Sequence, residues 1–457
     1  MNPNRSASFR IGAPVDRRRL LQGAALGGAG LLLARGPIAH AQDGGLSGEI
    51  TIGYEGAASG VIPYIEATAK AIEDANPDAT VTLQPSPGGN YATQVILQLN
   101  SGRAPDLFLL VGVAMAELAA ADLIAPMDEF TGDWDGWDQY PEALRESLTY
   151  DGSVWAIPYL MDTHFLYYNK DILEKAGLPR DWTPANPTEI LDAALKIKES
   201  DDSVIPYALY AGANGGNGTV SRGFIPLVNA FGGKLRDAEG KFIIDSCAIR
   251  EALDYYYRAY QTDETVPQEV MTSPQPGSAM RQAMIDGELG ILYEGSWAYG
   301  GWTDEDQDWT DENVGFVLFP GAGDVAPFAV GGTGNSWFIN NQTENKDLAW
   351  EFISQFNSVA NQVAINVEDP HIPARADAAA DSAFQATPFL SAMVESADSL
   401  LLTAPDRSFL QLVGIIQNAT GLIATGEATT DEAASRYAEE LTRVLGADNV
   451  VAQPCES

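Results

Sequence analysis

The 457-residue chain is poor in the residues that build most catalytic and metal sites, with only two cysteines and three histidines. His164 and His371 are the only histidines after residue 41, and no His-Glu-x-x-His, paired-cysteine metal motif, Gly-x-Ser-x-Gly or P-loop is present. We therefore expect no catalytic residue, no metal and no cofactor. Two cysteines are too few for a disulfide scaffold. Cys247 and Cys455 either form one bridge that ties down the C-terminal tail or stay two buried thiols.

Basic side chains are also scarce, since 26 Lys and Arg stand against 63 Asp and Glu. The first 41 residues hold six arginines and one aspartate, so the rest has 20 basic and 62 acidic residues, a formal charge of −42. Such a surface repels nucleic acid and anionic membranes. It indicates either a saline habitat or an ordinary acidic exported protein. The alternating carboxylates of Asp304–Asp308 lack the glycine and closing glutamate of a calcium loop, so we expect a solvated loop there.

The chain has no apolar run long enough to span a bilayer. Its N-terminus has Arg17-Arg18-Arg19-Leu20-Leu21, a short apolar run over 24–34, and the small-x-small site Ala39-His40-Ala41. These features predict a cleaved export signal over residues 1–41, of the twin-arginine type or an ordinary secretory one. No cysteine stands at the cut site, so we expect no lipid anchor. The mature chain is expected to be soluble and to work in the periplasm or outside the cell.

About 415 residues follow the signal, more than one hydrophobic core usually supports, so two domains are expected. Strand and helix patterns alternate from residue 49 to 121, which predicts an α/β fold with a parallel sheet. The run over 105–110 is continuously apolar, as in a sheet covered on both faces. From Asn345 onward the pattern is almost entirely helical.

Four sequence blocks, in this order and spacing, resemble one family. They are Gly102–Phe108 with Ala-Pro-Asp, Trp155–Tyr159 followed by Leu166–Leu178 with Tyr-Tyr-Asn-Lys-Asp, Ala283–Ala298 with Glu-Gly-Ser-Trp, and Ile372–Asp377 with Ile-Pro-Ala-Arg. The blocks resemble the extracellular solute-binding proteins of ABC importers, in the sugar-binding family that includes maltose-binding protein. The resemblance covers residues 50–445.

This resemblance implies two α/β lobes that close over a ligand by a hinge motion. Lobe one would comprise 46–160 plus 329–375, and lobe two 161–328 plus 376–457. The crossings would fall near 159–163, 328–334 and 373–377. It also implies a monomer that passes a sugar to the membrane subunits of an importer. A polyamine or osmolyte is the alternative ligand, and a secreted glycosidase is the alternative class, because a pair among so many carboxylates could flank a glycosidic bond.

Sugars present an apolar C–H face and a ring of hydroxyls, so aromatic rings, carboxylates and amides suit them. Trp297 follows a Gly-Ser turn where the family places its stacking tryptophan, and Asp162 lies where it can place an acidic ligand. Further candidates lie in loops, in helix starts and near hinges: Tyr54, Glu55, Asn90, Tyr91, Asn214, Asn217, Gly332, Thr333 and Arg375. For each, a purely structural or solvated role is the alternative. Trp155, Tyr168 and Asn169 are expected to be structural.

Overall fold

The computed structural model describes residues 45–56, 60–86, 91–268, 270, 276–402 and 408–455. The predicted export signal over residues 1–41 and the candidate Asn90 lie outside these residues. No helix of the described part is long and apolar enough to cross a membrane.

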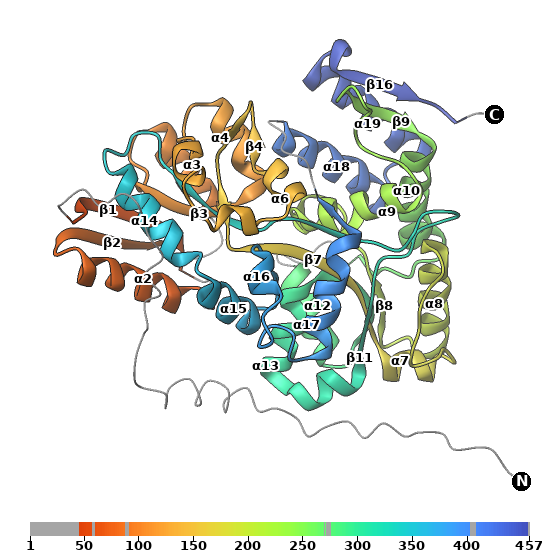
Figure 1. The fold of residues 1–457 in the computed structure, drawn as a ribbon. Helices are drawn as coiled ribbons and strands as arrows, with labels where there is room; N and C mark the ends of the chain where they lie inside the picture. The colour runs from red at the N-terminus through yellow and green to blue at the C-terminus, as the bar shows by residue number, and fades with distance from the viewer. Residues whose placement is uncertain are drawn as a thin grey trace, which may run out of the picture. The chain divides into compact units, whose positions relative to one another are not determined.

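The first sheet has the strand order β2 (Asp78–Ser86), β1 (Ser47–Glu55), β3 (Leu107–Val111), β13 (Asn335–Ile339) and β6 (Ile157–Pro158). The strands β1, β2 and β3 run parallel, and β13 is antiparallel to β3. The first four residues of β3 are buried, as its continuous apolar sequence predicts. Phe108 of β3 stacks on Phe338 of β13 with ring centroids 5.5 Å apart. Helices α2 (Ile62–Ala75) and α14 (Lys346–Phe356) pack beside β1 and β2 (Figure 1).

The second sheet is built around one long strand, β7 (Leu160–Asn169), nine of whose ten residues are buried. Its order is β15 (Leu400–Leu402), β12 (Ala329–Thr333), β7, β10 (Leu289–Gly295) and β8 (Ile205–Ala208), while β11 (Val314–Val317) and β14 (Ile372–Pro373) also pair with β7. Asn169 ends β7 and caps α7 (Lys170–Lys175), since its Oδ1 accepts from the amides of Asp171 and Ile172 at 3.0 and 3.1 Å. The Tyr-Tyr-Asn-Lys-Asp block therefore has a structural role at this turn.

The chain changes sheet at two short steps. It leaves the first sheet at Pro158 and enters the second at Leu160, and it leaves the second at Thr333 and returns to the first at Asn335. The strand β12, which the prediction counts with lobe one, pairs with β7 from Gly331↔Thr163 to Thr333↔Met161. Since sheet membership alone does not define a lobe, the lobe boundaries stay a proposal.

Several further helices pack on the second sheet or on one another. They are α8 (Pro187–Ser200), α9 (Ile225–Ala230), α10 (Cys247–Tyr257), α12 (Pro276–Ile285), α13 (Ser296–Asn313), α15 (Val359–Glu368), α17 (Pro388–Ser396), α18 (Phe409–Ala424) and α19 (Thr430–Leu445); α3 (Tyr91–Asn100) follows β2. Near the C-terminus β16 (Val450–Gln453) pairs in parallel with β9 (Phe242–Ser246). Cys247 and Cys455 form a disulfide beside this pair, so of the two alternatives the structure has the bridge.

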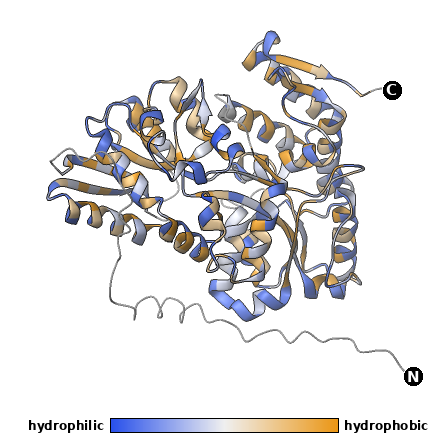
Figure 2. Ribbon diagram, viewed as in Figure 1, coloured by the Kyte–Doolittle hydropathy of each residue, from blue (hydrophilic) through white to orange (hydrophobic). Residues whose placement is uncertain are grey.

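The composition of the acidic segment Asp304–Asp308 predicted a loop. This prediction is wrong, because the segment is part of α13. Two helical segments meet there at Asp306, whose backbone is not helical. Trp302 anchors the segment: it is 3% exposed, and its Nε1 donates to the carbonyl of Arg281 at 2.8 Å. The carboxylates stay on the solvent side, and Figure 2 shows the hydrophilic colour along this helix. The burial of Trp302 thus outweighs the tendency of this acidic composition to form a loop.

Candidate functional site

Trp297 lies in the first turn of α13, immediately after β10 ends at Gly295. Its side chain is partly buried. The six-membered part of its ring lies so close to Gly295 that a Cβ there would fall 2.1 Å from Cη2. Glycine is therefore required at 295 for the indole to fold back over the strand end.

Two histidines surround the indole. The His371 ring stacks on it with centroids 5.5 Å apart and planes at 22°, and the His164 ring meets it edge-on at 5.4 Å. His371 Nδ1 donates to the carbonyl of Asp369 at 2.8 Å, and its Nε2 lies 3.8 Å from Asp162 Oδ1. Trp297 and Asp162, predicted separately, are thus joined through His371.

The glycine-rich segment 331–334, which is the end of strand β12 and the residue after it, lies directly beside Asp162. Gly332 pairs with Asp162 in the β12–β7 ladder, and a Cβ on Gly334 would fall 2.7 Å from Asp162 Oδ1. Thr333 is 7% exposed and packs against Gly112, whose amide donates to the Gly334 carbonyl at 2.9 Å. These small residues bring the end of β3 against the step between the two sheets.

Tyr54, Glu55 and Tyr91 lie at the carboxyl end of β1 in the first sheet. Tyr54 and Tyr91 are 2% and 8% exposed, and burial raises the pKa of both phenols, with nearby Glu66 and Glu55 adding to the effect. Glu55 is partly exposed. The residues that follow β1 lie near the segment before His371. Tyr64 Oη donates to Glu368 Oε2 at 3.3 Å, and a Cβ on Gly60 would contact Asp369, whose carbonyl accepts from His371.

Arg375 and the asparagines of the glycine-rich loop have different surroundings. The Arg375 guanidinium donates to both carboxylate oxygens of Asp377, at 2.9 and 2.7 Å, and lies over the Trp134 ring. Asn214 and Asn217 are exposed. Arg375 also donates from Nη1 to the Asn357 carbonyl at 3.4 Å. The part of Arg375, Asn214 and Asn217 in ligand binding stays a proposal.

A buried ionic network lies beside Trp297, and it was not predicted from the sequence. Glu294, the residue before Gly295, is 0% exposed and pairs with Arg222 Nη1 through Oε1. Its Oε2 accepts from Tyr210 Oη at 2.8 Å and lies 3.6 Å from Arg281 Nη1. Arg222 also lies over two rings, 5.0 Å from the centroid of Tyr210 and 5.9 Å from that of Trp297.

Protonation in this network follows from burial and charge. Burial alone would raise the pKa of Glu294, but Arg222 and Arg281 hold that pKa below its ordinary value, so the carboxylate stays ionised. Burial, reinforced by the charge of Arg222, lowers the pKa of His164. His164 is thus neutral near pH 7 and donates from Nδ1 to the Val330 carbonyl at 2.6 Å.

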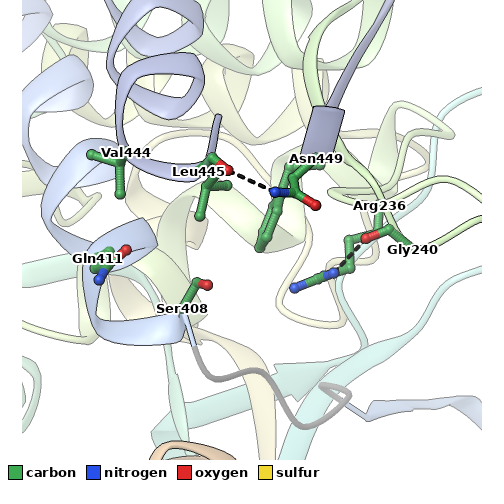
Figure 3. A pocket seen from close by; sticks show the side chains of 8 residues that line it. Arg236, Gly240, Ser408, Gln411, Val444, Leu445 and Asn449 are labelled. Atoms are coloured by element: carbon green, nitrogen blue, oxygen red, sulfur yellow. Dashed lines mark hydrogen bonds between the residues drawn. The ribbon is translucent and has the colours of Figure 1, made fainter. Parts of the chain in front are cut away.

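A separate hollow lies among α18, α19 and β9 (Figure 3). Its lining residues are Arg236, Gly240, Phe242, Ser408, Gln411, Val444, Leu445 and Asn449, and none is a candidate from the sequence. Arg236 lies 3.8 Å from the Phe242 ring centroid and donates to the Gly240 carbonyl, while Asn449 donates to the Leu445 carbonyl. The junction of the two sheets is the stronger candidate for a ligand site, because Trp297 and Asp162 are joined there through His371.

Comparison with known proteins identifies the family of this chain. A model of the bacterial extracellular solute-binding protein family matches residues 58–363. The maltotriose-binding protein of Pyrococcus abyssi is 23% identical over 298 residues, 64% of this chain and 59% of that protein. The maltodextrin-binding protein MdxE of Bacillus subtilis is 22% identical over 387 residues, 81% of this chain and 85% of that protein. The chain thus spans about three fifths of the first relative's length.

Solved structures establish the fold. A solute-binding protein of Thermotoga lettingae bound to α-D-tagatose superposes with a TM-score of 0.76 at 24% identity, over 88% of this chain and all of that one. Maltose-bound MalE3 of T. maritima gives 0.75 at 21% identity, over 87% and 99%. The α/β architecture is therefore the two-lobed one of periplasmic binding proteins. With more than half its length matched by the family model, the chain belongs to the bacterial extracellular solute-binding proteins, a family of binding proteins rather than enzymes.

Proposed function

We propose that this protein captures a mono- or oligosaccharide at the junction of its two sheets and delivers it unchanged to the membrane subunits of an ABC importer. The observation that carries the proposal is the position of Trp297. Its indole stacks on His371, which also lies beside Asp162, and the guanidinium of Arg222, the partner of Glu294, lies over the same indole. An aromatic face beside a carboxylate and a guanidinium suits the apolar face and the hydroxyls of a sugar.

The proposal includes the export and domain calls. Residues 1–41 would direct export, through the twin-arginine or the general secretory route, and the acidic mature chain would act as a monomer outside the cytoplasm. The lobes would be 46–160 plus 329–375 and 161–328 plus 376–457, with the ligand between them. Tyr54, Glu55, Asn90, Tyr91, Asn214, Gly332, Thr333 and Arg375 would complete the site from both lobes.

Calorimetric titration of the mature protein tests this function. The panel contains maltotriose, diacetylchitobiose, mannitol and tagatose, the ligands that its relatives and structural neighbours bind by name, together with spermidine. We expect saturable heat with at least one sugar, and chromatography should recover that sugar intact. Binding of spermidine alone would show that the ligand class is wrong. Consumption of a sugar would favour a glycosidase instead.

A further inference from the structure

The Arg222 side chain is held beside the indole of Trp297 by its contacts with Gly218, Tyr210 and Glu294. It lies in the irregular helical turn Val220–Phe224, after the glycine-rich loop. Its guanidinium packs so tightly on Gly218 that a Cβ there would fall 2.4 Å from Nη2. It also lies over the Tyr210 ring. The side chain is 16% exposed, so it lies at the boundary between the core and the site.

Glu294 fixes the orientation of this guanidinium. Its Oε1 accepts from Arg222 Nη1 and from the Gly295 amide at 3.0 Å, and its Oε2 accepts from Tyr210. Both carboxylate oxygens are therefore occupied, and Glu294 is fully buried. Such a group anchors its partner rather than binding a ligand itself.

The Arg222 guanidinium keeps donors from which no described residue accepts, the buried Nε–H among them. Its Nε is sealed from solvent and has no hydrogen-bond partner in the described part of the chain. Ser296 Oγ, next to Trp297 in sequence, is in the same condition among these residues. Buried donors without acceptors cost free energy, and that cost is removed when an acceptor oxygen arrives.

The charge around the indole also restricts the ligand. Arg222 and Arg281 together exceed the single carboxylate of Glu294 by one positive charge, whereas the carboxylates of Asp162 and Asp369 lie beside His371, each 3.8 Å from a ring nitrogen. A guanidinium near the indole already uses the attraction of the ring for a cation. A second cation at this face would lie close to the Arg222 guanidinium and be repelled by it. A neutral ligand with oxygen acceptors meets neither obstacle.

We propose that Arg222 is a ligand-binding residue of this site, positioned by Glu294, that donates to an oxygen of a neutral polyhydroxylated ligand and keeps cationic ligands away from Trp297. This inference rests on the proposed function and deepens it. It assigns a role to a residue outside the sequence blocks that indicated the family, and it separates the sugar from the polyamine alternative by the charge at the indole.

The test compares Arg222→Lys with wild type by titrating the sugar that binds best in the panel. Lysine keeps the charge that Glu294 requires but lacks the further donors of the guanidinium, so we expect affinity to fall at least tenfold. Arg250→Lys is the matched control, because Arg250 pairs with Asp245 and Asp431 on the surface, and its affinity should equal that of wild type. Circular dichroism and thermal melting without ligand confirm that each variant folds.

A second variant protects the test against misfolding of the first. Arg222→Gln combined with Glu294→Gln removes both charges of the buried pair and leaves only Arg281, which is 30% exposed, without its carboxylate partner. This double variant should lose sugar affinity while binding spermidine better than wild type. If Arg222→Lys and the double variant both bind the sugar as wild type does, the role of Arg222 is wrong while the proposed function stands. If wild type binds no sugar of the panel, the proposed function fails and the role of Arg222 fails with it.

Discussion

His371 lies flat against Trp297, with ring centroids 5.5 Å apart and ring planes at 22°. His371 directly precedes β14, which pairs with β7 at Leu160 and Met161, next to Asp162. Trp297 and Asp162 are therefore linked through one imidazole. On the proposed function, a sugar ring that stacks on this face of Trp297 must take the place of the imidazole.

Removal of the carboxylate at the hinge should weaken ligand binding. Asp162→Ala leaves sugar hydroxyls without an acceptor, at a cost of about 1–3 kcal/mol in binding free energy. Asp308→Ala, an exposed carboxylate of α13, is the control and should bind like wild type. Equal affinities of the two variants in calorimetry would remove Asp162 from the site.

A methyl group at Gly295 should displace the indole. Gly295→Ala places a Cβ 2.1 Å from the Trp297 ring, so the ring must move, at a cost of about 1–3 kcal/mol in stability and with loss of ligand affinity. Gly301→Ala in the same helix meets nothing within 4 Å and should be stabilising by about 0.5–1 kcal/mol. Denaturant unfolding and titration of both variants check the contrast. A Gly295→Ala protein with wild-type stability and affinity would contradict the observed packing.

Acid should destabilise the protein partly through His164. Because burial lowers the pKa of His164 in the folded state, the unfolded chain binds the proton more readily once pH falls below about 6.5. Stability contributed by the neutral imidazole is thus present above pH 6.5 and is lost on acidification, by at most about 1.4 kcal/mol per pH unit. His164→Asn should flatten the unfolding free energy between pH 6.5 and 5 relative to wild type. Parallel curves for the two proteins would contradict this.

Salt should stabilise the mature chain. With a formal charge of −42 after residue 41, self-repulsion is screened as the Debye length falls from about 30 Å at 0.01 M to about 3 Å at 1 M. The melting temperature should rise over this range of sodium chloride. A flat or falling curve would count against adaptation to a saline habitat.

Much of the fold was predictable because its signals are local. The apolar run of β3 and the Tyr-Tyr-Asn-Lys-Asp block each carry their structure within a few residues. The acidic part of α13 was predicted wrongly, since the burial of Trp302 depends on tertiary contacts that composition does not show.

The site was predictable only in part. Trp297 and Asp162 follow motifs, and the structure joins them through His371. The pairing of Arg222 with Glu294 bridges 72 positions, and no spacing rule connects an arginine in a helical turn to a glutamate near a strand end. One local signal was available: an ionisable residue inside the buried strand β10 needs a partner of opposite charge.

The most direct test of the central claim is a titration of the best-binding sugar into wild type, Trp297→Ala and Trp309→Ala. Trp309 is a partly buried tryptophan of the same helix and serves as the matched control. If the ligand stacks at the junction of the two sheets, Trp297→Ala should lose about 2–4 kcal/mol of binding free energy, and Trp309→Ala should bind like wild type. Equal sugar affinity of all three proteins would contradict a binding site at Trp297.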